Sequence, residues 1–246
     1  MFILYTNGLI AKQNNCYIIK YADDTAIIGL IYGENEEDYL NEVKGVTEWC
    51  NEHNLLLNVK KTKELIFDFR KHQVGHKQLS IAGSDVDIAH SYKYIGTIFD
   101  DELSWSLNTE NINNKCQQRL YFLRLLKSFG VDNTILKLFY MSIVQSVVSF
   151  NIIVWWPSIG KGNQDTLNRI HRKATKLVRD TLCNLDDIYV NNVVKKVTNI
   201  MSDTDHPFNN MYTTMRSERR LRAISCRTKR YGVSFVPNSI HIFNHV

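Results

Sequence analysis

The sequence predicts an α+β protein, with short strands in its N-terminal part and helices after them. Two runs rich in β-branched and aromatic residues, 17–21 and 25–30, indicate an antiparallel hairpin. From about residue 108 onward, apolar residues recur at helical spacing. With 246 residues, 44% of them hydrophobic, the chain is long enough for one or two domains with a core.

Charge and cysteine content narrow the class of protein. A formal net charge of +5 is compatible with binding to nucleic acid without requiring it. The five cysteines are scattered singly, which indicates neither a zinc site nor a disulfide framework, and we expect buried thiols in a reducing compartment. We identify no signal peptide, and Ile143–Trp156 is shorter than the roughly 20 apolar residues of a spanning helix. The sequence thus predicts an intracellular protein without a membrane segment.

The predicted hairpin carries two adjacent carboxylates, Asp23 and Asp24, at its tip. Two like charges repel each other, so both stay ionised most easily beside a divalent cation. Mg²⁺ prefers one or two carboxylates together with substrate phosphates, and paired metals at such a tip serve phosphoryl transfer. The alternative is an ordinary exposed turn, because Asp is a common turn residue.

The residues around the pair favour the chemical interpretation. Tyr21-Ala22-Asp23-Asp24 resembles the catalytic Tyr-x-Asp-Asp box of reverse transcriptases, and 20–28 is most similar to the version in non-LTR (LINE-type) retrotransposons. This resemblance implies an RNA-directed DNA polymerase in which Asp23 and Asp24 are catalytic and bind Mg²⁺ (or Mn²⁺), and Tyr21 contacts substrate. It implies an RNA template, a DNA primer and their RNA–DNA duplex as partners.

The resemblance also implies that the chain starts inside the palm domain of such a polymerase. In that family the palm's first metal-binding aspartate lies upstream of the segment that Met1–Asn7 resembles. Nucleotidyl transfer needs both metals held rigidly, so we expect this chain to be inactive by itself. An upstream palm fragment is then a further expected partner.

A helix and a basic turn are expected after the hairpin. Glu36, Glu37 and Asp38 favour a helix start, and apolar residues continue at helical spacing to about Asn54. A basic turn at 58–63 precedes an expected strand, Glu64–Arg70. By resemblance, Lys61 and Lys63 approach the phosphates of the incoming nucleotide. A solvated basic turn is the alternative for each of them.

Two further strand-like runs, Leu79–Ile88 and Ser91–Asp100, complete the predicted half-palm of residues 1–104. The second run is similar to the strand that in the family lies where palm meets thumb, near the primer. Gly96 within it indicates a bulge or the close approach of another backbone. The alternative is a structural hairpin without chemistry.

Residues 105–182 are predicted to form a helical bundle, with helices at about 109–128, 132–150 and 163–181. A bundle after the palm resembles a polymerase thumb. Basic residues off its apolar faces are candidates for contacts with a duplex backbone, although a solvated face is the alternative. These residues are Lys115, Arg119, Arg169, Arg172, Lys173 and Lys176.

The remaining residues, 183–246, are less periodic and more polar, and we expect a basic, partly irregular tail. It resembles the C-terminal segment of many vertebrate non-LTR elements. Its basic residues include Arg216, Arg219, Arg220, Arg222, Arg227, Lys229 and Arg230.

Two other functions remain open. The first is a non-catalytic nucleic-acid-binding or vestigial protein that keeps only its basic helices. The second follows from 91–178, which resembles the segment labelled as the N-terminal region of AlkB homologue 8, a class that includes 2-oxoglutarate-dependent dioxygenases and methyltransferases. None of the eight histidines is followed two places later by an acidic residue, as an iron-binding facial triad usually requires. We therefore do not expect that chemistry here.

Overall fold

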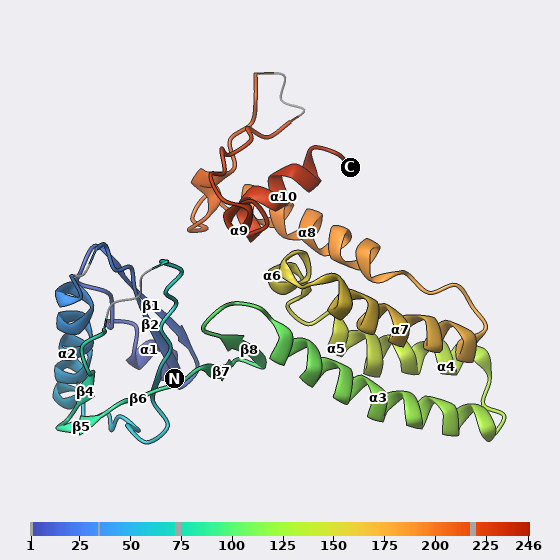
Figure 1. Ribbon diagram of the computed structural model, residues 1–246, viewed down its shortest axis with the longest axis horizontal. Coiled ribbons are helices and arrows are strands. Elements are labelled where there is room, and N and C mark those ends of the chain that lie inside the picture. The colour runs from blue at the N-terminus through green and yellow to red at the C-terminus, as the bar shows by residue number, and fades with distance from the viewer. Residues whose placement is uncertain (1, 34, 72–74, 217–219) are drawn as a thin grey trace. The chain divides into compact units, whose positions relative to one another are not determined.

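The computed structural model describes residues 2–33, 35–71, 75–216 and 220–246. Contacts divide the chain into two compact units, Met1–Tyr92 and Lys93–Val246. Each unit mixes helix and strand in its own proportion, and together they agree with the expected α+β class. Figure 1 shows small strand pairs with one long helix in the first unit and a helical bundle in the second.

The first unit contains two helices and most of the strands. Its helices are α1 (Phe2–Tyr5) and α2 (Glu37–Glu52). Its strands are β1 (Cys16–Tyr21), β2 (Asp24–Gly29), β3 (Lys63–Glu64), β4 (Ser80–Ile81), β5 (Ser84–Asp85) and β6 (Asp87–Ile88), and β7 (Ser91–Tyr94) leads into the second unit. The strands pair two by two, as β1–β2, β3–β6, β4–β5 and β7–β8, where β8 is Thr97–Asp100.

Helix α2 organises the first unit. Its buried residues Val43, Val46 and Cys50 follow helical spacing and belong to the two small hydrophobic cores of the unit. Glu42 on the same face is 3% exposed. Its buried carboxylate is stabilised by hydrogen bonds that it accepts from the backbone N–H groups of Lys12 (2.9 Å) and Gln13 (2.8 Å). The helix thereby fixes the loop that precedes β1.

Two expectations for the strands need correction. The run Glu64–Arg70 is strand only at Glu64, and within the described residues no strand pairs with 65–70. Strand geometry needs a neighbour to accept its hydrogen bonds, and the described residues supply a strand partner only up to Glu64. The pair β3–β6 is also parallel, whereas we expected antiparallel strands throughout.

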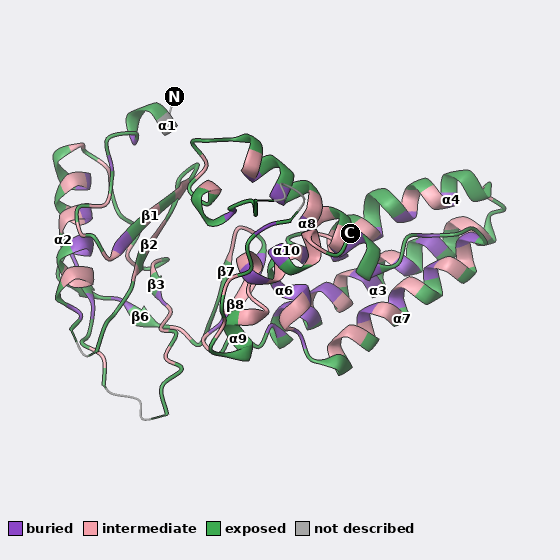
Figure 2. Cartoon of the chain, turned by 90° about the horizontal axis from the view of Figure 1, so that it is seen from above, coloured by how far each residue is buried: buried purple, intermediate pink, exposed green. Residues whose placement is uncertain are grey.

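The second unit is a helical bundle around one core. Its helices are α3 (Ser106–Ser128), α4 (Asn133–Phe139), α5 (Ser146–Val148), α6 (Ile152–Trp155), α7 (Lys161–Val178), α8 (Leu185–Ser202), α9 (Lys229–Gly232) and α10 (Phe235–Phe243). A π-helical segment, Tyr140–Gln145, joins α4 to α5, and short 3-10 turns lie at Trp156–Ser158 and Asn209–Met211. Figure 2 shows bands of buried residues along α3 and α7, which pack together.

The bundle begins earlier than the expected boundary at 104/105, because the β7–β8 hairpin packs with the helices. Gly96 lies in the turn of this hairpin with φ +85°, and a Cβ there would lie 3.1 Å from the Phe150 ring. The close neighbour of Gly96 is therefore a side chain, whereas a bulge or the approach of another backbone was expected. The Asn151 side chain also donates a hydrogen bond to Thr97 in β8 (2.8 Å).

Residues 183–246, the expected partly irregular tail, also contain helices that pack into the bundle. Helix α8 is 18 residues long, and its residues Val193, Val197 and Ile200 are fully buried in the core of the bundle. Ile240 of α10 joins the same core. Arg219 of the basic cluster lies outside the described residues. Val193, Val197 and Ile200 are spaced by four and three residues, as in a helix. This spacing was not recognised in the sequence because polar residues lie between them.

Two smaller expectations were tested as well. Cys16, Cys50 and Cys116 are buried as expected, whereas Cys183 is exposed and Cys226 partly exposed. Across the described part of the chain, no single helix is long and apolar enough to span a membrane. Asn133–Val148 and Ile152–Ser158 meet that test only together, as a pair bent by 44°.

Candidate functional site

The acidic hairpin tip has the geometry of a tight two-residue turn. Tyr21 at the end of β1 pairs with Asp24 at the start of β2, so Ala22 and Asp23 alone make the turn. Ala22 has φ +52°, as the first central residue of a type II′ hairpin turn requires. Asp23 therefore lies in the turn itself and Asp24 on the first residue of the returning strand.

The two faces of this hairpin differ in character. Ile18 and Ile27, which lie opposite each other, pack against residues of α2. Tyr21 and Asp24 also lie opposite each other and share the other face, which is exposed. Helix α2 therefore supports the hairpin from behind and leaves both carboxylates accessible to a ligand.

Asp23 and Asp24 by themselves would provide only part of the ligands of a metal site. Over the described ranges, no three His, Cys, Asp or Glu side chains lie together in a group that could hold a metal ion. Mg²⁺ bound to two carboxylates takes its remaining ligands from phosphates and water. The residues present therefore suit one edge of a divalent-cation site but do not complete it.

The structure separates the two lysines that were expected to approach phosphates. Lys61 is exposed in a turn where its backbone N–H donates to the Asn58 carbonyl (3.0 Å). Lys63 lies in β3, where its ammonium pairs with the Asp87 carboxylate of β6 and lowers the pKa of that group. Lys63 has a structural partner across the parallel strand pair, and Lys61 has its side chain in solvent.

The basic residues on α7 form one continuous stripe. Arg169, Arg172, Lys173 and Lys176 follow steps of three, one and three residues, which place them along a single side of the helix. All four are exposed, while Leu167, Ile170 and Ala174 on the opposite side are buried in the core. Within the described residues, no hydrogen bond or ion pair engages these four side chains.

The two basic residues on α3 have a different environment. Lys115 and Arg119 are only partly exposed. The Arg119 guanidinium donates a hydrogen bond to the Ile143 carbonyl in the π-helical segment. That segment leaves carbonyl groups without their usual partners, so Arg119 has a structural role that its sequence position did not indicate.

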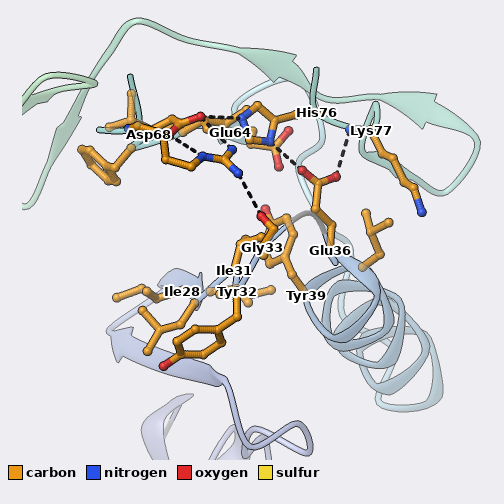
Figure 3. A pocket seen from close by; sticks show the side chains of 18 of the residues that line it. Ile28, Ile31, Tyr32, Gly33, Glu36, Tyr39, Glu64, Asp68, His76 and Lys77 are labelled. Atoms are coloured by element: carbon orange, nitrogen blue, oxygen red, sulfur yellow. Dashed lines mark hydrogen bonds and ion pairs between the residues drawn. The ribbon is translucent and has the colours of Figure 1, made fainter. Parts of the chain in front are cut away.

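A groove in the first unit was not foreseen from the sequence. It encloses about 680 Å³ and lies between the strand β2 with its following loop, helix α2, and the segment 64–70. Figure 3 shows Ile28, Ile31 and Tyr32 on one side and Glu64 and Asp68 on the other. No motif or spacing marks these residues, because they lie far apart in the chain.

Polar side chains on the 64–77 side of the groove form a connected network (Figure 3). The Arg70 guanidinium donates to both oxygens of Asp68 (2.9 and 2.8 Å) and to the Gly33 carbonyl (2.9 Å). These bonds lower the pKa of Asp68 to about 2. His76 lies between Glu36 and Asp68, with Nδ1 bonded to Glu36 and Nε2 3.9 Å from an Asp68 oxygen.

The pKa values of two glutamates in this groove are shifted in opposite directions. Burial raises the pKa of Glu36, but hydrogen bonds from the Lys77 backbone N–H (2.9 Å) and from His76 outweigh it and leave the pKa lowered. Burial also raises the pKa of Glu64, and there it prevails although Tyr39 donates a hydrogen bond to the carboxylate. Glu64 is 8% exposed, and no described residue makes a hydrogen bond to its Oε2 atom.

Comparison with known proteins gives one partial likeness. The family model described as "Alkylated DNA repair protein alkB homolog 8, N-terminal" matches residues 105–146, which is a narrower stretch than the 91–178 expected from the sequence. The matched residues comprise α3, α4 and the π-helical segment, which pack together. No curated protein and no solved structure matches the chain. The reverse transcriptase resemblance thus rests on the sequence motifs alone.

Proposed function

We propose that this chain is the late palm and thumb part of a non-LTR retrotransposon RNA-directed DNA polymerase and that it has no polymerase activity by itself. The hairpin carries this proposal: Asp23 and Asp24 stand at a two-residue turn, on an exposed tip backed by a helix. Such a tip suits divalent cations and the phosphates that they bind. The incomplete set of ligands is the reason for expecting no activity.

Template-directed primer extension in Mg²⁺ or Mn²⁺ tests this proposal. We expect no incorporation by the folded chain, because two carboxylates cannot hold two metals rigidly. An upstream palm fragment that supplies the missing aspartate is expected to restore incorporation, and the double substitution Asp23→Ala, Asp24→Ala to abolish it again. Incorporation by the chain alone would contradict the expected inactivity, and restored incorporation that survives the double substitution would contradict the catalytic role of the pair.

The exposed basic stripe of α7 favours a second, non-catalytic function: binding to the backbone of an RNA–DNA duplex. Lysine and arginine side chains that neutralise phosphates give affinity without sequence specificity and make it fall as salt rises. The stripe supports this function because its four cations are exposed and engage no other described residue.

Charge reversal on this stripe gives the corresponding prediction. Lys173→Glu with Lys176→Glu is expected to weaken duplex binding at least tenfold at low salt and to reduce the slope of log affinity against log salt by about two or more. Lys195→Glu with Lys196→Glu on α8 is the matched control, since these lysines are also exposed. Equal losses in both variants, measured by fluorescence anisotropy, would show a general charge effect and no site on α7.

The match to the AlkB homologue 8 N-terminal model does not lead us to propose dioxygenase or methyltransferase activity. The matched residues form helices of the bundle, and none of the chain's histidines opens a His-x-Asp or His-x-Glu pair. A role shared with that family would lie in the helical surface of residues 105–146.

A further inference from the structure

The strand β2 has one edge that no described strand covers. Among the described residues its only partner is β1. The Leu30 N–H donates to the Asn15 carbonyl (2.8 Å), so Asn15 and Leu30 form a hydrogen-bonded pair and alternate pairs toward the turn do the same. The backbone N–H and C=O groups of Thr25, Ile27 and Gly29 therefore point away from β1.

A second unpaired stretch of chain bounds the groove on the opposite side. Leu65, Ile66 and Phe67 follow β3, and none of them makes a backbone hydrogen bond to any described residue. Ile27 and Gly29 of β2 and residues 65–67 line the same 680 Å³ groove, and Tyr39 and Leu40 of α2 line it as well. A strand residue occupies about 160 Å³ at normal strand rise, strand spacing and sheet thickness. The groove therefore matches about four residues of one extended strand.

The Glu64 carboxylate needs a hydrogen-bond donor from a ligand in the groove. It lines the groove, is more than nine-tenths buried, and its Oε2 atom has no hydrogen-bond partner among the described residues. Tyr39, which donates to this carboxylate, is held against Gly29, where an added Cβ would lie 2.7 Å from the tyrosine ring. A buried carboxylate oxygen without a donor is costly, and a ligand that supplies the donor removes that cost.

We propose that this groove binds one extended segment of a partner polypeptide, which adds as a strand to the free edge of β2 and places a lysine or arginine against Glu64. Addition of a strand satisfies the outward-pointing N–H and C=O groups of Thr25, Ile27 and Gly29 at the spacing at which they occur. Alternate apolar side chains of the segment pack on the apolar groove lining. This inference concerns the first unit alone and does not rest on the proposed polymerase ancestry.

Synthetic peptides of eight residues, in which valine and threonine alternate and one lysine is moved along the sequence, are suitable probes. Fluorescence anisotropy with the whole chain is expected to identify a lysine position that binds best. The same peptide with glutamate in place of lysine is expected to bind at least tenfold more weakly, because it sets a second carboxylate against Glu64. A version with alternate backbone amides N-methylated is expected not to bind, because it cannot donate to the strand edge.

The matched protein variants are Glu64→Gln and Glu52→Gln, the latter an exposed glutamate on α2. Glu64→Gln is expected to weaken binding of the lysine peptide about tenfold, and Glu52→Gln to leave it unchanged. Circular dichroism establishes that both variants are folded. Absence of binding by every peptide, equal binding by the N-methylated peptide, or an unchanged affinity in folded Glu64→Gln would overturn the proposal.

Discussion

At the scale of single residues, Ala22 has a strained backbone conformation at the hairpin tip. An L-residue with a side chain at φ +52° is strained by about 1 kcal/mol, and glycine adopts this conformation without that strain. Asp23 and Asp24 hold their positions only because this turn is kept tight. The sequence shows only that a small residue occupies position 22. The positive φ of this residue is seen only in the folded hairpin.

We predict that Ala22→Gly stabilises the first unit by up to about 1 kcal/mol, because the relief of strain exceeds or balances the added entropy of glycine in the unfolded chain. Urea unfolding followed by circular dichroism measures the change. Ala26→Gly is the control, since Ala26 lies within β2 outside the positive-φ residues, and it should destabilise the unit. A similar loss of stability in both variants would contradict the strained turn.

Glu64 gives a prediction about pH. Its folded pKa is raised by burial, so its contribution to stability is fully present below the unfolded pKa of about 4.3 and is lost as pH rises through the folded pKa. The glutamine side chain in Glu64→Gln does not ionise, so the variant does not lose this stability as pH rises. We therefore expect the variant to gain stability relative to the parent chain as pH rises from 4 to 8.

The difference in unfolding free energy between the two chains, measured by urea titration at several pH values, tests this sign. Asp68 and Glu36, whose pKa values are lowered, act in the opposite direction at acid pH and are present in both chains. The charge of Glu36 also helps to raise the pKa of Glu64, so its repulsion is part of the difference that is measured. A difference that stays constant with pH would show that Glu64 ionises in the folded protein as it does in the unfolded chain.

At the scale of elements, the start of α3 depends on a residue outside the helix. Trp105 at the N-cap position has φ +61° and makes no side-chain cap. Asp100 at the end of β8 instead holds the two residues that precede the first helical residue: its carboxylate accepts hydrogen bonds from the backbone N–H groups of Ser104 (2.8 Å) and Trp105 (3.0 Å). Asp100 is 6% exposed, so these bonds are shielded from water.

We predict that Asp100→Ala destabilises the second unit by about 1–3 kcal/mol, because it leaves the buried backbone N–H of Trp105 and the part-buried N–H of Ser104 without this acceptor. Thermal or urea unfolding monitored by helical circular dichroism measures the loss. Glu102→Ala, at an exposed position in the same turn, is the control and should change stability by less than about 0.5 kcal/mol. Equal effects would show that the turn tolerates loss of the Asp100 contacts.

At the scale of the whole molecule, residues 183–246 contribute to the helical core. Residues of α8 and α10 lie in the same buried cluster as those of α3 and α7. Nine buried residues of this cluster follow position 182: Leu185, Ile188, Tyr189, Val193, Val197, Ile200, Tyr212, Leu221 and Ile240. The second unit is therefore complete only when the C-terminal helices are present.

Truncation tests this arrangement. A chain that ends at residue 182 is expected to lose cooperative unfolding of the bundle, because core side chains on α3, α6 and α7 become exposed. A fragment of residues 90–246 is expected to keep it, since its core is internal to the second unit. Unchanged cooperativity of the 1–182 chain would show that α8 and α10 add little to the core.

The sequence by itself determined the α+β class, the hairpin with its acidic tip, the long helices and the basic stripe of α7. These features depend on local propensity, turn chemistry and periodicity, which are determined by residues that are close together in the sequence. The tertiary structure decided which of them are structural: Arg119 bonds a π-helical carbonyl, Lys63 pairs with Asp87, and the C-terminal helices enter the core. It also assembled the groove around Glu64 from segments distant in sequence, because packing and unpaired strand edges arise only when those segments meet.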